Sequence, residues 1–233
     1  MKPLAGAINF EGGGMAQSIN AMQLEMGITS IFSENIVGFD KVGYQKKEAV
    51  ISSFAEYLGV NALSSVTDDQ VGRLMMTERP LDVALSEKGY FQVLNSNGNI
   101  ELTRDGRFKL SKDGELLTQE NQKVLSANGN PIVLPVVPDT IDKIKIGLDG
   151  KIGVFDNEKR GLIPSGTIGV VSADGSLVSS DCVRQGFLEY SNVSLEKEYI
   201  EMANYKRNFE INARMFRLQN SKLSNAIQTL SRV

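Results

Sequence analysis

The apolar residues between Leu195 and Leu230 follow a single helical period. Alternating steps of four and three residues trace a stripe that is apolar at nearly every position, as in a coiled coil. The stripe consists of Leu195, Tyr199, Met202, Lys206, Phe209, Ala213, Phe216, Asn220, Leu223, Ile227 and Leu230. At ~1.5 Å per residue the helix would be about 58 Å long, too long for one compact domain to cover. The stripe therefore predicts a partner helix, from this chain or from a neighbouring copy.

The start of this helix and its two polar stripe positions refine the prediction. Ser191 or Asn192 is expected to cap the first turn, because their side chains can accept backbone N–H groups. Lys206 and Asn220 stand where a buried polar residue usually fixes register or oligomer state. The alternative is a helix packed on its own domain, with both residues at an exposed edge. The pattern leaves both interpretations open.

A second helical pattern lies near the other end of the chain. Residues 1–14 end in three glycines, whose backbone freedom predicts a flexible lead-in. Apolar residues then recur at helical spacing from Met15 to Val37, before Gly38 and Gly43 end the helix. Residues 15–48 are thus predicted as a helix and a turn. The two helices form either the core of one domain or a shaft shared between copies.

Between the helices the apolar period changes to two residues. Five pairs of apolar runs flank residue pairs that tolerate the positive φ angles of tight hairpins. These turn pairs are Asn97-Gly98, Asp113-Gly114, Asn128-Gly129, Asp149-Gly150 and Asp174-Gly175. Their aspartates could be mistaken for calcium ligands, but no stretch has the alternating acidic spacing of an EF-hand loop. The pattern predicts a chain of antiparallel hairpins.

The predicted fold class is α+β. N- and C-terminal long helices form a coiled-coil-like shaft, and a central all-β domain of antiparallel hairpins spans residues 81–185. Residues 49–80 mix short apolar runs with Ser, Gly and Asp, and are interpreted as an extended connector. Residues 186–233 are assigned to the C-terminal helix, which packs with the N-terminal one.

Composition excludes several classes of function. The net charge of −3, from 25 basic and 28 acidic residues with no dense basic block, argues against a nucleic-acid or anionic-membrane surface. No apolar run reaches the ~18 residues of a membrane span, and the first residues lack the pattern of a cleaved secretion signal. Histidine is absent and Cys182 is the sole cysteine, which removes histidine-based catalysis and the usual zinc sites. We expect no catalytic residue, no cofactor and no metal.

Six segments resemble the bacterial flagellar basal-body rod and hook family, most closely its distal and proximal rod proteins. Residues 34–46 are similar to the family signature, an Asn-Asn-Ile-Ala-Asn run followed by Thr-x-Gly-Tyr-Lys, but depart from it at Glu34, Gly38 and Lys41. The other segments are residues 77–85, 89–93, 102–108, 185–193 and 205–212. The stretch before Gln185 is shorter than in typical distal rod proteins, which leaves the choice among rod paralogues open.

The resemblance implies a structural subunit that polymerises helically into the rod, with terminal helices in an inner tube and the β domain outside. It also implies homo-oligomers, contacts with other rod and hook proteins, and export through the flagellar type III apparatus without signal-peptide cleavage. The expected location is the basal body, in the cell envelope and periplasm. The expected assembly residues are Asn35, Ile36, Gly43, Tyr44, Asn192, Met202, Arg207, Phe209, Glu210, Asn212, Phe216, Asn220 and Leu223.

Two other functions are alternatives to assembly. A carboxylate-dependent peptidoglycan hydrolase would need two acids from the set Asp82, Asp105, Glu115 and Asp149. Three of these lie in or beside predicted turns, and none has the apolar surroundings that raise a pKa for acid catalysis. A monomeric β binding module would need an aromatic-lined groove or a charged cluster, and the sequence offers neither. Assembly is the favoured interpretation.

Overall fold

The computed structural model describes residues 13–52, 63–156, 161–178 and 181–231. The chain divides into two compact units. The first, called here the helical unit, contains residues up to 36, residues 47–66 and residues from 195 onward. The second, called here the β unit, contains residues 37–46 and 67–194. The fold is therefore α+β, with an N-terminal helix, a central antiparallel β region and a C-terminal helix, as predicted.

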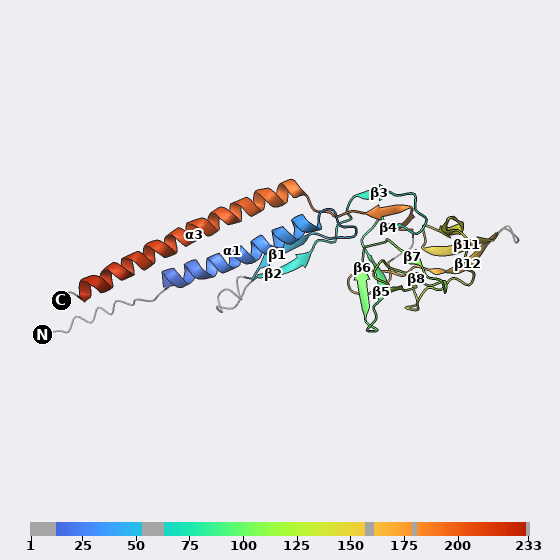
Figure 1. The fold of residues 1–233 in the computed structure, drawn as a ribbon, viewed down its shortest axis with the longest axis horizontal. Helices are drawn as coiled ribbons and strands as arrows, with labels where there is room; N and C mark the ends of the chain where they lie inside the picture. Colours follow the sequence, from blue (N-terminus) through green and yellow to red (C-terminus); the bar gives the residue numbers. More distant parts are fainter. Residues whose placement is uncertain (1–12, 53–62, 157–160, 179–180, 232–233) are drawn as a thin grey trace. The chain divides into compact units, whose positions relative to one another are not determined.

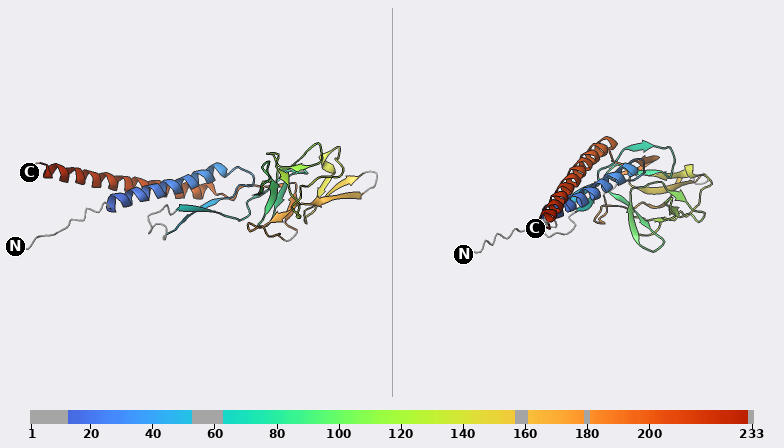
Figure 2. Two further views of the ribbon diagram at one scale, coloured as in Figure 1. Left: turned by 90° about the horizontal axis from the view of Figure 1, so that it is seen from below. Right: turned by 60° about the vertical axis from the view of Figure 1, so that its left-hand side comes forward.

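The helical unit is built on two antiparallel helices, α1 (Gly13–Gly38) and α3 (Leu195–Leu230), which run side by side (Figures 1 and 2). The rings of Phe32 and Tyr205 pack with centroids 5.5 Å apart. Strands β1 (Lys47–Ile51) and β2 (Leu63–Thr67) pair in a two-stranded sheet beside α1. A Cβ placed on Gly27 of α1 would lie 2.4 Å from a methyl carbon of Leu63, so the missing side chain of this glycine leaves room for that of Leu63.

Both helices differ from their predicted bounds. The expected lead-in falls mostly on residues 1–12, outside the described residues, but α1 already includes Gly13 and Gly14. The side chain of Gln219 in α3 lies close to this start, because a Cβ on Gly14 would be 2.8 Å from its Nε2. The helix α3 begins at Leu195 rather than within residues 186–192. Ser191 and Asn192 therefore do not cap it.

The segment 49–80, expected as an extended connector, supplies strands that pair within sheets. It holds most of β1, all of β2, and β3 (Leu74–Met76), which pairs antiparallel with β15 (Phe187–Glu189). The predicted β boundaries at 81 and 185 are therefore too narrow. The cause is a pairing between segments more than a hundred residues apart, which local sequence patterns do not report.

The β unit contains three further sheets (Figure 1). The largest sheet has the strand order β13-β5-β9-β8-β7, and β6 also pairs with β5. A second sheet has the order β10-β11-β12, and in the third β14 pairs with β4. The bounds are β4 (Val83–Leu85), β5 (Tyr90–Leu94), β6 (Ile100–Thr103), β7 (Lys109–Leu110), β8 (Leu116–Leu117), β9 (Lys123–Val124), a 3-10 turn (Ile141–Lys143), β10 (Ile144–Ile146), β11 (Lys151–Asp156), β12 (Gly161–Thr167), β13 (Val170–Val171) and β14 (Val183–Gln185). Phe91 and Phe108 pack edge to face at 5.2 Å in the core.

All five predicted hairpin turns are confirmed. The glycine of each turn pair has a φ between 75° and 85°, the left-handed conformation that glycine adopts at low cost. The runs on either side pair antiparallel, for example Ile144 with Val154 across Asp149-Gly150. The carboxylates of Asp149 and Asp174 accept the backbone N–H groups of Lys151 and Ser176 at 3.1 Å and 3.0 Å. These aspartates therefore serve the turns themselves.

Candidate assembly site

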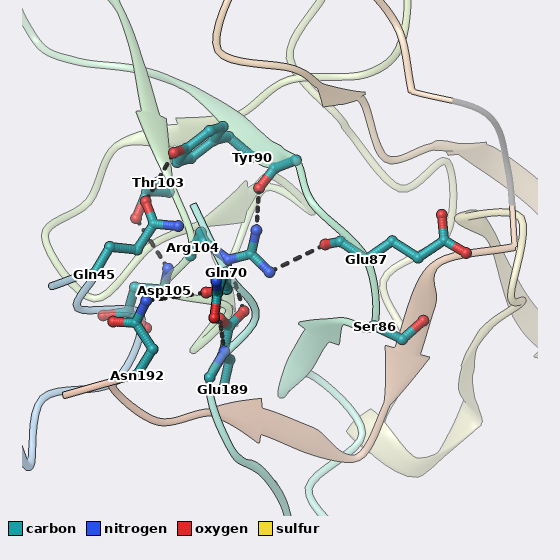
Figure 3. Close-up of polar contacts among 12 residues, drawn as sticks. Gln45, Gln70, Ser86, Glu87, Tyr90, Thr103, Arg104, Asp105, Glu189 and Asn192 are labelled. Atoms are coloured by element: carbon teal, nitrogen blue, oxygen red, sulfur yellow. Dashed lines mark hydrogen bonds and ion pairs between the residues drawn. The ribbon is translucent and has the colours of Figure 1, made fainter. Parts of the chain in front are cut away.

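A buried ion pair joins three of the family-like segments in the β unit (Figure 3). Arg104 donates from Nε to Oε2 of Glu189 at 2.7 Å, and the two side chains are only 1% and 3% exposed. The guanidinium also donates to the carbonyl oxygens of Gly89 at 2.7 Å and Glu87 at 3.1 Å. The other carboxylate oxygen of Glu189 accepts the N–H of Gly72 at 2.8 Å. Because the other polar atoms of this buried ion pair are also hydrogen-bonded, removing one partner would cost a large part of the folding free energy.

The predicted residue Gly43 contacts Glu189, and Tyr44 follows it in the chain. The N–H of Gly43 donates to the carbonyl oxygen of Glu189 at 2.8 Å, and its φ is 70°. A Cβ at Gly43 would lie 2.4 Å from the backbone nitrogen of Asp105, so the position admits only glycine. The ring of Tyr44 fills the space where a Cβ of Gly38 would stand. These signature residues thus fix the path of the chain within the β unit.

Asn192 ties three segments of the β unit together. Its Oδ1 accepts the N–H of Lys46 at 2.7 Å, and its Nδ2 donates to the carbonyl oxygens of Asp68 and Gln70, each at 3.2 Å (Figure 3). Nearby, the hydroxyl of Tyr90 donates to Oε1 of Gln45 at 2.8 Å. The amide of Asn192 therefore uses both its donor and its acceptor inside the subunit.

Asn35 links three segments of the helical unit, as Asn192 does in the β unit, and it is fully buried. Its Oδ1 accepts the N–H of Lys47, and its Nδ2 donates to the carbonyl oxygen of Lys47, both at 2.8 Å. The same Nδ2 donates to Oε2 of Glu198 at 2.9 Å. One amide thus connects α1, β1 and α3, while the next residue, Ile36, is half-buried.

Sequence reasoning missed the charged residues of these two clusters. Glu198 is not among the predicted site residues, yet it is fully buried. Arg104 and Glu189 were quoted within family-like segments but not as site residues. The sequence feature that could have indicated a buried charge is a single charged residue between apolar neighbours, as in Phe187-Leu188-Glu189-Tyr190. Such a charge, when buried, needs a partner, but the sequence does not say which.

The stripe of α3 divides into a covered and an uncovered part. Met202, Phe209, Asn212 and Phe216 are half-buried, and Asn212 donates from Nδ2 to Oε1 of Glu25 in α1 at 3.1 Å. Exposed members of the predicted site are Arg207, Glu210, Asn220 and Leu223.

Lys206 and Asn220 are exposed, whereas Tyr205 and Gln219, one residue earlier, are half-buried. The half-buried positions keep a seven-residue repeat, which agrees with the predicted stripe at Met202, Phe209 and Phe216 and differs from it by one residue at the other position of the repeat. Lys206 and Asn220 therefore do not fix the register within this helix pair, and the interpretation of an exposed edge is correct for the single chain.

An open groove of about 730 Å³ runs along one side of the helix pair. Its lining is largely apolar: Met26, Thr29, Ser30 and Ser33 from α1, and Tyr199, Met202, Ala203, Lys206 and Phe209 from α3. Met26 and Tyr199 are both more than half exposed. An exposed apolar surface of this kind marks an interaction site. Neither helix has an apolar stretch long enough to cross a lipid bilayer, as judged over the described residues.

The acids considered for hydrolysis are engaged in local contacts or buried. Glu115 pairs with Lys123 at 2.7 Å and Asp149 with Lys151 at 2.6 Å. The hydrogen bond from Lys151 lowers the pKa of Asp149, the opposite of what a general acid needs. Asp105 pairs with Arg107, and Asp82 is buried. Within the described ranges, no three acidic, cysteine or histidine side chains cluster as a metal site would require.

Comparison with known proteins gives two family matches. The model described as "Flagellar hook protein FlgE/F/G D1 domain" matches residues 84–154, and "Flagellar basal body rod FlgEFG protein C-terminal" matches residues 184–229. Arg104 lies in the first match and Glu189 in the second, so the buried ion pair joins the two.

Several curated proteins are similar over most of the chain. The flagellar basal-body rod protein FlgG of Bacillus subtilis (strain 168) is 28% identical over 229 residues, which cover 80% of this chain and 85% of that protein. FlgF of Mesorhizobium japonicum is 27% identical over 227 residues, and FlgF of Rhizobium meliloti (strain 1021) is 28% identical over 230 residues. Each of these two alignments covers 90% of this chain and 93% of the relative. The chain is thus about equally similar to FlgG and FlgF proteins.

Proposed function

Because this chain belongs to the flagellar basal-body rod protein family, we propose that it polymerises helically through its terminal helices. Its role is that of a structural subunit of the rod. The observation that carries the proposal is the apolar surface which α1 and α3 leave uncovered, including the groove around Met26 and Tyr199. A helix pair with such a surface gains stability when another copy covers it.

The polymer would lie in the basal body, where the helices form a coiled-coil-like shaft and the β unit an outer layer. It would contact other rod and hook proteins at its two ends. Export would proceed through the flagellar type III apparatus without cleavage of a signal peptide. Family membership supports these assignments.

The subunit is proposed to have no catalytic activity. Asp149 and Glu115 are each paired with a lysine, and the turn and ion-pair contacts described above account for them. A monomeric β binding module is disfavoured, because it would leave the apolar surface of the helical unit permanently in water.

Sedimentation of the purified full chain over a range of concentrations, followed by electron microscopy, tests the proposal. Filaments with a constant diameter are expected above a critical concentration. A protein that stays monomeric at all concentrations and with added rod fragments would contradict it. Peptidoglycan release by the same preparation would instead support the hydrolase.

A further inference from the structure

The sheet β10-β11-β12 has two edges, because each outer strand pairs only with β11 among the residues that the structure describes. The edge of a sheet presents N–H and C=O groups that can pair with a strand of another chain, above all where the edge is long and apolar. With seven residues, β12 is the longest strand described, and its exposed Leu162 lies opposite the exposed Phe155 of β11. Open edges would therefore favour strand pairing between copies at this sheet.

A side-chain amide covers the edge of β10. The Oε1 of Gln185 accepts the N–H of Ile146 at 3.1 Å, and its Nε2 donates to the carbonyl oxygen of Ile144 at 2.9 Å. The same Nε2 donates to the carbonyl oxygen of Pro80 at 2.8 Å. Residues two apart in a strand turn their backbone groups to the same neighbour, so both bonds to β10 use groups that a further strand would need. The amide of Gln185 thus takes the place of a neighbouring strand.

A proline and a bulge protect the edge of β12. Pro164 lies opposite Gly153 and has no N–H to donate, so this pair is of the kind without mutual hydrogen bonds, and the nitrogen of Pro164 faces away from β11. A strand added at this edge would find no donor there. The next pair along the ladder is Ile152 with Gly166, which leaves Ser165 as an extra residue on β12. Such a bulge bends an edge strand and hinders further pairing.

We propose that Gln185 and Pro164 determine where copies of this chain can meet, by keeping the β unit from joining another copy through strand pairing. The inference goes beyond the proposed function and does not rest on it, because it concerns a surface that contacts between copies must avoid. Identical subunits in a polymer lie at high local concentration, so an open edge on each would compete with the correct contact.

Pro164→Val in the full chain tests the edge of β12. Valine supplies an outward N–H and favours a strand, so the concentration at which the protein self-associates should fall by about tenfold or more. Pro135→Val is the matched control, because Pro135 is exposed and lies outside the strands. Both changes are made in a chain that carries Phe209→Ala and Phe216→Ala, to weaken association through the helices. Sedimentation measures the association, and near-ultraviolet circular dichroism checks that each variant is folded.

Hydrogen exchange of the associated Pro164→Val variant identifies the surface that is used. The amide of Leu162 and the new amide at position 164 should become protected, as expected for added strand hydrogen bonds. Association without this protection, a folded variant that does not associate more readily, or an equal effect of Pro135→Val would each contradict the proposal.

Gln185→Leu tests the edge of β10 in the monomer. Without the amide, the N–H of Ile146 loses its acceptor and should exchange about tenfold faster or more, while that of Val154 in β11 stays slow. Unchanged exchange at Ile146 would contradict the role of Gln185. If this variant does not fold, Pro164→Val decides the proposal alone.

Discussion

The two units of this protein satisfy their side chains in different ways. The β unit encloses its own apolar core, in which Phe91 and Phe108 are fully buried, and pairs the buried Arg104 with Glu189. The helical unit buries its polar residues Asn35 and Glu198 but leaves Ile211, Leu218 and Leu230 exposed. Apolar side chains such as Leu177 are exposed in the β unit too, but the main cluster of buried apolar residues lies in that unit. An exposed apolar face along a helix is typical of a surface that a partner covers. We expect folding to be local to the β unit and assembly to depend on the helical unit.

The largest effect is expected from breaking the buried ion pair. Arg104→Ala leaves Glu189 buried without its cation, which should destabilise the β unit by about 3–5 kcal/mol. Denaturant unfolding followed by near-ultraviolet circular dichroism measures this. Arg107→Ala is the matched control, because Arg107 and Asp105 form a partly exposed pair that should contribute about 0–1 kcal/mol. Similar losses in both variants would contradict the assigned role of Arg104.

The second effect separates assembly from folding. Phe209 and Phe216 are only half-buried in the single chain, so Phe209→Ala with Phe216→Ala should cost less than the ~3 to 5 kcal/mol typical of a fully buried phenylalanine. The variant should nevertheless lose filament formation and motility. The thermal transition of the β unit should hardly move. If the variant builds functional rods, or if its β unit unfolds as well, the two units are not separable in this way.

A smaller effect is expected at Asn35. Asn35→Ala removes one buried amide that serves α1, β1 and α3, at a cost of about 1–3 kcal/mol. Hydrogen exchange should then accelerate in β1 and at the adjoining ends of both helices, with no change in the β unit. Asn220→Ala, at an exposed position of α3, is the control. An unchanged exchange pattern in Asn35→Ala would show that the amide is dispensable.

The smallest effect is the change of stability with pH, which should have opposite signs in the two units. Burial raises the pKa of Glu25 above its ordinary value of 4.5, while the hydrogen bond from Asn212 opposes the shift. Protonation therefore favours the folded helix pair, whose stability should fall as pH rises through the pKa of Glu25. In the β unit, hydrogen bonds lower the pKa of Asp149 and Asp174 below 3.8, so that unit should lose stability in more acid solution.

The unfolding of each structural unit is followed separately between about pH 3 and pH 7, a range that includes the ordinary pKa values of carboxyl groups. The two pH dependences are then compared. Glu25→Gln keeps the hydrogen-bonding shape and removes the charge, and should flatten the pH dependence of the helical unit alone. A helical unit that loses stability on acidification from pH 7 would contradict the assignment to Glu25.

Local chemistry predicted much of this fold. The turn pairs such as Asn97-Gly98 fixed the hairpins, because their positive φ is a property of the residues themselves. Both helices were predicted from their apolar period. The pairing of β3 with β15, and of Arg104 with Glu189, joins residues far apart in sequence. Only the folded chain selects such partners.

The predicted stripe of α3 matches half-buried residues at Met202, Phe209 and Phe216, but it is one residue out of step at Lys206 and Asn220, where Tyr205 and Gln219 are half-buried instead. Both sets of residues keep a seven-residue repeat. The choice between two neighbouring positions depends on where α1 packs, which the local pattern does not report.

Hydrogen exchange of the same chain as monomer and as polymer tests the division between the two units most directly. In the monomer, strands β4, β5 and β9 should be strongly protected, while residues 218–230 of α3 exchange rapidly. In the polymer, α3 should become protected along its whole length, with the β strands unchanged. Equal protection of α3 in both states would contradict the account, because the helical unit would then be complete without a partner.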